Sequence, residues 1–317
     1  MSKEEIKQQT ETLQVKFAEI KASEEHVQDK EPDAETVAYV KGLNPIDDIF
    51  FNKMGESPEV DEEIISTILQ VPVKVLKVIP QNTIASLQGR GVRLDALADV
   101  IVPGIQVKAE LLKDCPIGEK GAKINIEVQK DDNDDHQKRV LFNAAAVMLN
   151  ETPKGTKKFK DVPDVVVIFI SRFDVFKKGR MFYEVERTLK GLGEAVYNGM
   201  REYYVNAAIK DRSTEGMADI TDLMEIFVES DRYDYEKFPK ISERKHQFKN
   251  TEEGVKAMSD GLQELLDKKA KEQEQATTIS HIKDIMENLK LSLDQAMDAL
   301  RIPQGQRSTY EGLIKNS

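Results

Sequence analysis

Three stretches between residues 71 and 129 alternate apolar and polar residues, and this alternation predicts three β-strands. They read "VPVKVLKVIP" at 71–80, "VRLDALADVIV" at 92–102 and "KINIEVQ" at 123–129. Successive side chains of a strand point to opposite faces of its sheet. The second stretch therefore puts Asp95 on the face opposite Leu94, and the third puts Glu127 and Gln129 on one shared face.

A run of consecutive apolar residues from Val165 to Ile170 predicts a strand that is buried on both faces. Such a strand lies at the centre of a sheet that helices cover on both sides. The stretch "YYVNAAI" at 203–209 predicts a further strand. The chain therefore carries the strands of a central sheet and needs helices to cover it.

Helix signals lie between and after these strands. A proline follows a capping residue at Asn44–Pro45 and at Ser57–Pro58, which predicts two helix starts. Apolar residues at helical spacing predict helices at 137–150 and 221–235. From Lys240 the chain is charged and helical, with Ser292 as a cap and Pro303 as a breaker. This order predicts an α/β core with a mixed sheet, without the regular alternation of a doubly wound fold.

The changes in composition along the chain predict three regions. Residues 1–43 read as a weakly helical N-terminal extension, residues 44–239 as the α/β core, and residues 240–317 as a charged helical C-terminal region. Within the core, residues 103–121 hold two glycine-rich turns and predict an extended hairpin or an insertion. The C-terminal helices are also the place where we expect contacts between copies of the chain in a homo-oligomer.

Charge and cysteine content exclude several classes of protein. The formal net charge is −11 and the pI is about 5.1, so a broad electropositive surface is excluded and any nucleic-acid contact is local. The single cysteine, Cys115, excludes a disulfide framework and a cysteine-rich zinc site. No apolar run approaches the length of a membrane span, so we expect a cytoplasmic protein without a membrane partner.

Asp95 and Glu127 are the residues that could carry chemistry. Two carboxylates on neighbouring strands form a hard-oxygen site that suits Mg²⁺. Gln129 follows on the same face as Glu127, and Arg139 lies early in the next helix, where a guanidinium could hold a phosphate with two hydrogen bonds. A solvent-facing sheet edge explains the same residues equally well.

The order of several short motifs resembles a known family. The stretches "DDIFFNKM", "VRLD", "INIEVQ", "KRVLF", "VVVIFISRFDVF" and "YYVN" are similar in order and register to the PD-(D/E)XK nuclease superfamily. Within it they resemble the bacterial PD-(D/E)XK nuclease family transposases, which are allied to the recombination-promoting nucleases. The resemblance runs from about Pro45 to Ala270, and "SLDQAMDALRIP" resembles the tail that these proteins carry.

The resemblance implies a PD-(D/E)XK restriction-endonuclease-like core and a hydrolase that cuts DNA with Mg²⁺ or Mn²⁺. It implies that Asp95 and Glu127 bind the metal and that Gln129 stands where the superfamily has lysine. Arg139 matches the arginine after the "IE-x-Q" strand, and Glu59, or its neighbour Glu63, is the candidate acid on the early helix. Such a protein acts in transposition, recombination or defence. The alternative is a catalytically degenerate nuclease fold that binds DNA or protein, which glutamine at the lysine position favours.

Two basic clusters are the candidates for contact with the DNA backbone. They are Lys154, Lys157 and Lys158 in "PKGTKKFK", and Lys177, Lys178 and Arg180 in "FKKGR". Other polar residues have simpler interpretations. We expect Asp99 to be solvated or paired with a lysine, the acidic run Asp131–Asp135 to be a solvated turn, and His136 to lie at the surface or at a helix start.

Overall fold

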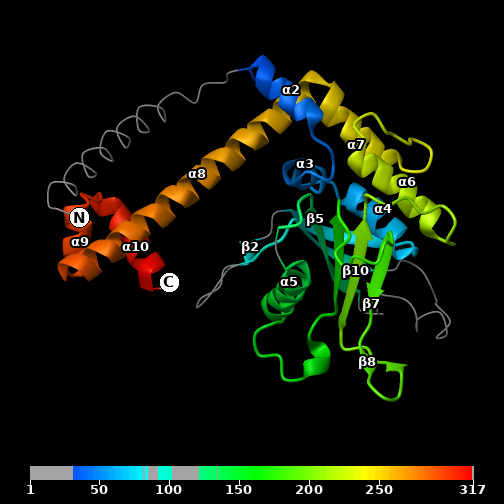
Figure 1. The fold of residues 1–317 in the computed structure, drawn as a ribbon, viewed down its shortest axis with the longest axis horizontal. Coiled ribbons are helices and arrows are strands. Elements are labelled where there is room, and N and C mark those ends of the chain that lie inside the picture. The colour runs from blue at the N-terminus through cyan, green and yellow to red at the C-terminus, as the bar shows by residue number, and fades with distance from the viewer. Residues whose placement is uncertain (1–30, 81–82, 85–91, 102–120, 134, 316–317) are drawn as a thin grey trace. The chain divides into compact units, whose positions relative to one another are not determined.

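The structure is a computed structural model, and it describes residues 31–80, 83–84, 92–101, 121–133 and 135–315 (Figure 1). Its strands are β1 (Lys74–Pro80), β2 (Thr83–Ile84), β3 (Val92–Arg93), β4 (Ala96–Ile101), β5 (Ala122–Gln129), β6 (Val165–Ser171), β7 (Phe182–Val185), β8 (Thr188–Leu189), β9 (Glu194–Ala195) and β10 (Met200–Asn206). Its helices are α2 (Ala34–Gly42), α3 (Asp48–Met54), α4 (Pro58–Leu69), α5 (His136–Glu151), α6 (Met217–Val228), α7 (Pro239–Asn250), α8 (Glu252–Leu289), α9 (Leu293–Ala299) and α10 (Gln304–Lys315), with a short 3₁₀ turn, η1 (Phe159–Asp161).

A six-stranded mixed sheet organises the α/β part of the chain, as the sequence predicts. The strand order is β1-β4-β5-β6-β10-β7. The central strands β5, β6 and β10 run parallel, and β1, β4 and β7 run antiparallel to their neighbours. Parallel pairing of β5 with β6 requires a crossover between them, which α5 provides.

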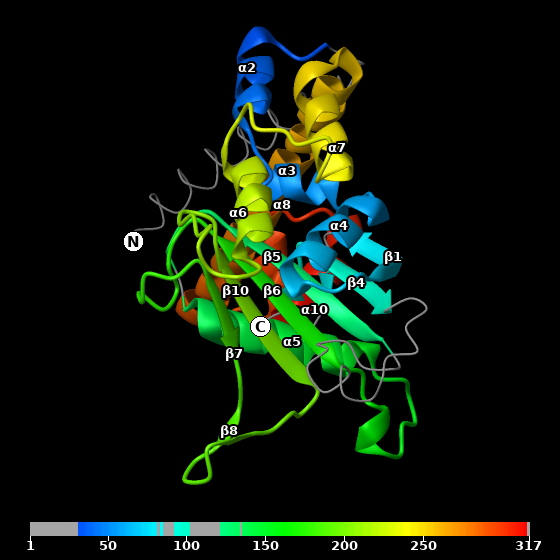
Figure 2. The same ribbon diagram turned by 90° about the vertical axis from the view of Figure 1, so that its right-hand side faces the viewer.

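Strand β6 lies at the centre of the core, and each of its residues is buried. Helix α5 covers one face of the sheet through Val140, Ala144 and Val147, which pack with Val167 and Phe169 of β6. Helices α4 and α6 lie on the other side of the sheet (Figures 1 and 2). The apolar run therefore forms the doubly covered strand that the sequence predicts.

Several predicted element bounds needed correction. Helix α3 begins at Asp48, not at Pro45, because Asp47 is its N-cap and accepts a hydrogen bond of 2.9 Å from the backbone N–H of Asn44. The strand predicted at 92–102 is broken at Leu94–Asp95 into β3 and β4. The helix predicted at 221–235 is α6, shifted toward the N-terminus. Ser57 and Ser292 are the N-caps of α4 and α9, as predicted.

The unit that contains the sheet extends beyond the predicted boundary at residue 239. It reaches Leu262 and so includes α7 and the first turns of α8. The carboxylate of Glu63 on α4 accepts hydrogen bonds of 3.2 and 2.8 Å from the backbone N–H groups of Lys240 and Ile241, which ties the start of α7 to the core. From Gln263, the described residues form a second unit with its own small apolar core, made of Ile282, Ala296, Met297, Ile302 and Tyr310.

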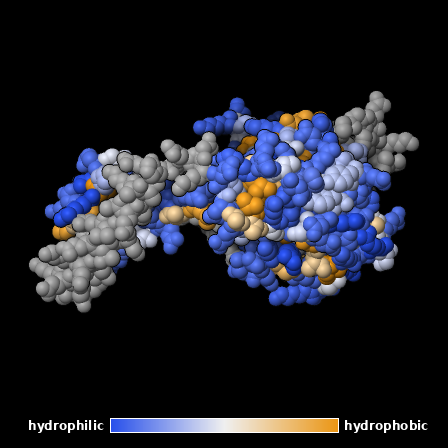
Figure 3. All heavy atoms as spheres, turned by 90° about the horizontal axis from the view of Figure 1, so that it is seen from above, coloured by the Kyte–Doolittle hydropathy of each residue, from blue (hydrophilic) through white to orange (hydrophobic). Residues whose placement is uncertain are grey.

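Parts of the predicted organisation lie outside the described residues. These are residues 1–30 of the N-terminal extension and residues 103–120 of the hairpin or insertion, with Cys115 among them. Among the helices that the structure describes, none is both long and apolar enough to cross a membrane. The face of the molecule in Figure 3 is mainly hydrophilic, and apolar residues form small separate patches on it.

Candidate functional site

Asp95 and Glu127 lie close together where β4 begins beside β5. In the antiparallel pair β4–β5, Ala96 pairs with Ile126 and Leu97 with Asn125. Asp95 directly precedes β4, and its Oδ2 accepts a hydrogen bond of 3.0 Å from the backbone N–H of Val128, the residue after Glu127. Glu127 lies on the sheet face that α5 covers, where Arg139 of α5 reaches it. Leu94 also packs against α5, so the predicted alternation, which put Asp95 on the face opposite Leu94, ends at the break between β3 and β4.

Both carboxyl groups are buried. Asp95 is 8% exposed and Glu127 is 0% exposed. Burial raises the pKa of Asp95 well above its usual range, and the charge of Glu127 raises it further, whereas the hydrogen bond from the backbone N–H of Val128 (3.0 Å) opposes the rise. Burial also raises the pKa of Glu127, and Arg139 opposes this most strongly. The pair therefore disfavours two negative charges unless a cation lies nearby.

The guanidinium of Arg139 supplies that cation. Its Nη2 donates to Glu127 Oε2 at 3.0 Å, and its Nη1 donates to Gln129 Oε1 at 2.5 Å. Asn125 Nδ2 donates to the other carboxylate oxygen of Glu127 at 3.0 Å. We call Asp95, Asn125, Glu127, Gln129 and Arg139 the carboxylate cluster. Four members were predicted from the sequence, and Asn125 joins them because it is two residues before Glu127 on the same strand face.

Two further residues reach the carboxylate cluster without having been predicted as members. Asp48, in the first turn of α3, adds a negative charge that raises the pKa of Asp95. Asn143 lies one helical turn after Arg139 on α5, is buried, and its side-chain amide lowers the pKa of Glu127, although its Nδ2 has no hydrogen-bond partner within bonding distance among the described residues. The spacing of four residues between Arg139 and Asn143 is the sequence signal that could have identified Asn143.

The carboxylate cluster fits the ligands that Mg²⁺ prefers. Mg²⁺ is bound by one or two protein carboxylates and keeps several waters, and Asp95 and Glu127 supply two buried carboxylates with raised pKa values. Within the described ranges, no group of three or more His, Cys, Asp or Glu side chains is arranged to hold a metal ion. An ion at this place would therefore be held by two carboxylates and would replace the contact of Arg139 with Glu127.

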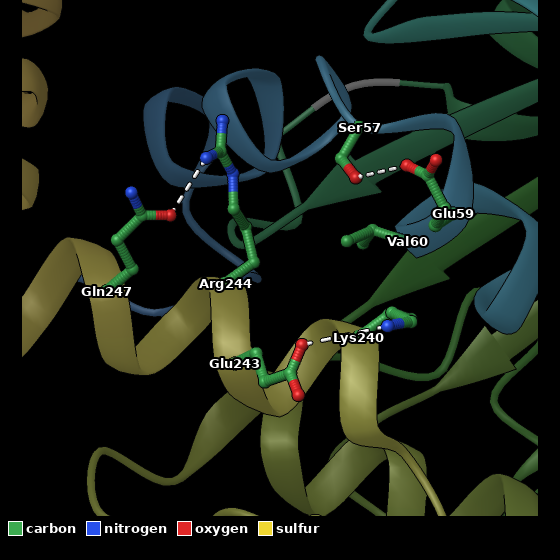
Figure 4. A pocket seen from close by; sticks show the side chains of 7 residues that line it. All are labelled: Ser57, Glu59, Val60, Lys240, Glu243, Arg244 and Gln247. Carbon is green, nitrogen blue, oxygen red and sulfur yellow. Dashed lines mark hydrogen bonds and ion pairs between the residues drawn. The ribbon is translucent and has the colours of Figure 1, made fainter.

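The structure does not bring Glu59 or Glu63 to the carboxylate cluster. Glu59 is exposed, accepts a hydrogen bond of 2.9 Å from Ser57 Oγ, and lines a cavity of about 300 Å³ together with Lys240 and Arg244 of α7 (Figure 4). Glu63 holds the start of α7 instead. The buried acid of α4 is Asp61, whose two carboxyl oxygens have no hydrogen-bond partner among the described residues, and burial raises its pKa.

The two basic clusters lie at opposite ends of the sheet. Lys177, Lys178 and Arg180 are exposed in the connection between β6 and β7. This connection begins beside Gln129, because the backbone N–H of Arg172 donates to the Gln129 carbonyl at 3.1 Å. The other cluster, Lys154, Lys157 and Lys158, is exposed in the connection between α5 and β6. It precedes Val165, which pairs with Lys123 near the start of β5 and so lies at the far end of the sheet.

The remaining predicted polar residues have structural roles. Asp99 pairs with Lys123 at 2.5 Å, as predicted. The described aspartates of the run 131–135 are exposed, and Asp135 caps α5 by accepting from the backbone N–H of Lys138 at 3.1 Å. His136 starts α5, which is one of the two predicted alternatives, and its ring is buried against Phe169 and Phe173.

The geometry thus assembles two buried carboxylates, one guanidinium and two amides at the end of β5. This set can hold a divalent cation or remain neutralised by its own arginine. Family models, curated proteins and solved structures were each compared with the chain, and none of them matches it.

Proposed function

We propose that this protein is a metal-dependent DNA endonuclease of the PD-(D/E)XK type, with the carboxylate cluster as its active site. The observation that carries the proposal is that two buried carboxyl groups, Asp95 and Glu127, are neighbours: Asp95 Oδ2 accepts a hydrogen bond of 3.0 Å from the backbone N–H of Val128, and the charge of Glu127 raises the pKa of Asp95. Two neighbouring buried acids beside an arginine are costly to keep for stability alone. They are what a site for a divalent cation requires.

Asp95 and Glu127 would hold Mg²⁺ or Mn²⁺. When bound, such an ion supplies Lewis acidity toward a phosphoryl oxygen and lowers the pKa of a water molecule. Arg139 would exchange its bonds with Glu127 and Gln129 for bonds to a phosphate, which a guanidinium can hold with two parallel N–H groups. Gln129 would position groups through its amide, because a neutral amide can neither supply positive charge nor act as a general acid.

The position of Lys177, Lys178 and Arg180 supports the same proposal. They are exposed and follow β6, whose last residue, Ser171, pairs with Gln129 at the end of β5. Side chains of this type bind the phosphate backbone and fix the orientation of a duplex without reading its sequence. These three cations are therefore the groups at that end of the sheet that could hold a DNA backbone, beside the exposed aspartates that follow β5.

A second candidate function is a degenerate nuclease fold that binds DNA or protein without cutting. One observation favours it. Both carboxylate oxygens of Glu127 already accept hydrogen bonds, from Asn125 and Arg139, so the carboxylate is satisfied without a metal ion. Assembly of copies through α8, α9 and α10 stays a prediction under either function.

Plasmid nicking in Mg²⁺ or Mn²⁺ tests the two functions. We expect cleavage by the wild-type protein and a loss of about a thousandfold in Glu127→Gln and Asp95→Asn, because each variant removes one carboxylate ligand. Asp99→Asn is the matched control, since Asp99 lies on the same strand and pairs with a lysine. Equal cleavage by the wild type and Glu127→Gln would refute this site. Retained DNA binding without cleavage would select the degenerate fold.

A further inference from the structure

An exposed phenylalanine stands inside the basic cluster at the far end of the sheet. The side chain of Phe159 is 95% exposed, although the ring is large and apolar. It begins the 3₁₀ turn η1 and lies directly between Lys158 and Lys160. A single exposed apolar side chain is common on protein surfaces, so the groups around the ring decide whether it belongs to a binding site.

Backbone hydrogen bonds hold the turn that presents the ring. The N–H of Asp161 donates to the Lys158 carbonyl at 3.0 Å, and the N–H of Val162 donates to the Phe159 carbonyl at 3.1 Å. Before it, the N–H of Thr156 donates to the Pro153 carbonyl at 3.1 Å. The ring therefore projects from a folded turn, so little conformational entropy is lost when a ligand covers it.

The charge around this ring is strongly positive for so acidic a chain. Residues 153–161, which we call the Phe159 loop, contain four lysines and one aspartate in a protein whose net charge is −11. The four lysines are Lys154, Lys157, Lys158 and Lys160, and all of them are exposed. The loop thus combines a single aromatic face with positive charge on both sides of it, and a polyanion with flat apolar groups complements both features.

We propose that the Phe159 loop is a second nucleic-acid site, one that binds single-stranded DNA or RNA by stacking an unpaired base on Phe159. Its lysines neutralise the flanking phosphates. Proteins that bind single strands without sequence preference combine aromatic platforms with positive charge in this way. A duplex is a poorer ligand, because its bases already stack on one another and do not offer a free face.

The Phe159 loop is separate from the carboxylate cluster. The loop precedes β6 and the cluster lies beside the end of β6, so the seven residues of that strand stand between them. At a rise of about 3.3 Å per residue, this is roughly 20 Å. The two sites therefore bind different parts of a substrate, and the proposal does not depend on whether the carboxylate cluster cuts DNA.

Fluorescence anisotropy with a labelled oligothymidylate tests the proposal. The full chain is used in EDTA, in the wild-type and the Glu127→Gln backgrounds, so that cleavage plays no part. We expect Phe159→Ala to weaken binding by about fivefold to a hundredfold, as the loss of one base–aromatic stack does. Phe159→Tyr keeps an aromatic face and should restore binding, whereas Phe159→Leu keeps only the apolar character and should not.

The salt dependence supplies an independent readout. Lys157→Ala combined with Lys158→Ala should lower the slope of log Kd against log salt by about 1.4, since each phosphate contact to a single strand contributes about 0.7. The matched control is Lys268→Ala with Lys271→Ala, two exposed lysines of α8 outside both proposed sites, which should leave oligothymidylate binding unchanged. Equal effects of the two double variants would overturn the assignment to the Phe159 loop.

An anionic membrane surface is the competing partner of such a loop, and the same variants distinguish it. Phe159→Leu inserts into lipid about as well as phenylalanine does. Two results together would overturn the proposal in favour of lipid. The first is that Phe159→Leu still binds phosphatidylserine vesicles, and the second is that Phe159→Ala leaves oligothymidylate binding unchanged.

Discussion

Replacing Arg139 by methionine tests the electrostatic description of the carboxylate cluster. The substitution keeps much of the aliphatic side chain and removes the guanidinium, whose Nη2 lies 3.0 Å from Glu127 Oε2. Glu127 then retains its hydrogen bond from Asn125, but it stays next to Asp95 without the neighbouring cation. We expect the folded state to lose stability in the absence of divalent metal.

The magnitude follows from burial. Removing one partner of a buried ion pair costs about 3–5 kcal/mol because the other charge stays buried and unpaired. Glu127 is 0% exposed, but the Arg139 side chain is 32% exposed, so solvent already screens part of the interaction. We therefore expect a loss of roughly 2–3 kcal/mol. For a unit of this size that corresponds to a fall in Tm of about 4–12 °C.

Thermal unfolding followed by circular dichroism in EDTA at pH 7.5 measures this loss. Lys138→Met is the matched control: it removes the same charge from the neighbouring residue of α5, whose side chain is 84% exposed, and should cost less than about 0.5 kcal/mol. Addition of 10 mM Mg²⁺ should then stabilise Arg139→Met more than the wild type. An ion with a Kd near 1 mM contributes about 1.4 kcal/mol at that concentration. If Arg139→Met and Lys138→Met unfold at the same temperature, the reasoning is refuted.

Two further predictions concern parts of the fold away from the carboxylate cluster. Lys245 is buried, and its Nζ lies within hydrogen-bonding distance of the carbonyls of Ile226, Glu229 and Arg232, so Lys245→Met should cost about 1–3 kcal/mol in urea unfolding. Burial lowers the pKa of Lys245 to about 7 from 10.5. Above pH 7 the folded protein therefore binds fewer protons than the unfolded chain. The stability of the wild type relative to Lys245→Met should consequently rise by up to about 1.4 kcal/mol per pH unit between pH 7 and 9. A difference that is flat with pH would mean that the three carbonyls keep the ammonium charged. Gly121 has φ +81°, and an added Cβ would lie 2.5 Å from the Val100 carbonyl oxygen, whereas Gly155 has φ +84° and open space around it. Gly121→Ala should therefore lower Tm by several degrees more than Gly155→Ala. Equal shifts in Tm would show that the positive φ alone sets the cost of the substitution.

Local periodicity predicted part of the carboxylate cluster. The alternation within β5 is enough to place Glu127 and Gln129 on one face. Asp95 precedes β4, where the alternation no longer applies, and it reaches β5 through the hydrogen bond from the backbone N–H of Val128. The same argument identified β6, because a run of consecutive apolar residues does not suit a strand that exposes one face to solvent. These features depend on residues close together in the sequence, so they could be predicted without knowing which elements pair.

The acid on α4 shows where the prediction failed although a local signal was present. Glu59 was chosen from the first turn of the helix, yet it faces the cavity beside α7. Asp61 is followed at intervals of three, four and seven residues by Ile64, Ile65 and Ile68, which are all buried. That spacing places Asp61 on the apolar face of the helix, so the sequence contained the information that Asp61, and not Glu59, is the buried acid.

Strand direction is the information that the sequence did not supply, and it decides what the two basic clusters can do. Both clusters flank the same strand, and from the sequence both were candidates for one DNA contact. Because β6 runs parallel to β5, the segment before it and the segment after it lie at opposite ends of the sheet. Only the later cluster can therefore share a ligand phosphate with Arg139. Substitutions in the two clusters should consequently act independently on the free energy of binding. For a substrate with both duplex and single-stranded parts, the effect of combining Phe159→Ala with Lys177→Ala should equal the sum of the two separate effects. Strong non-additivity would mean that the two clusters act on the ligand as one site, which would contradict their placement at opposite ends of β6.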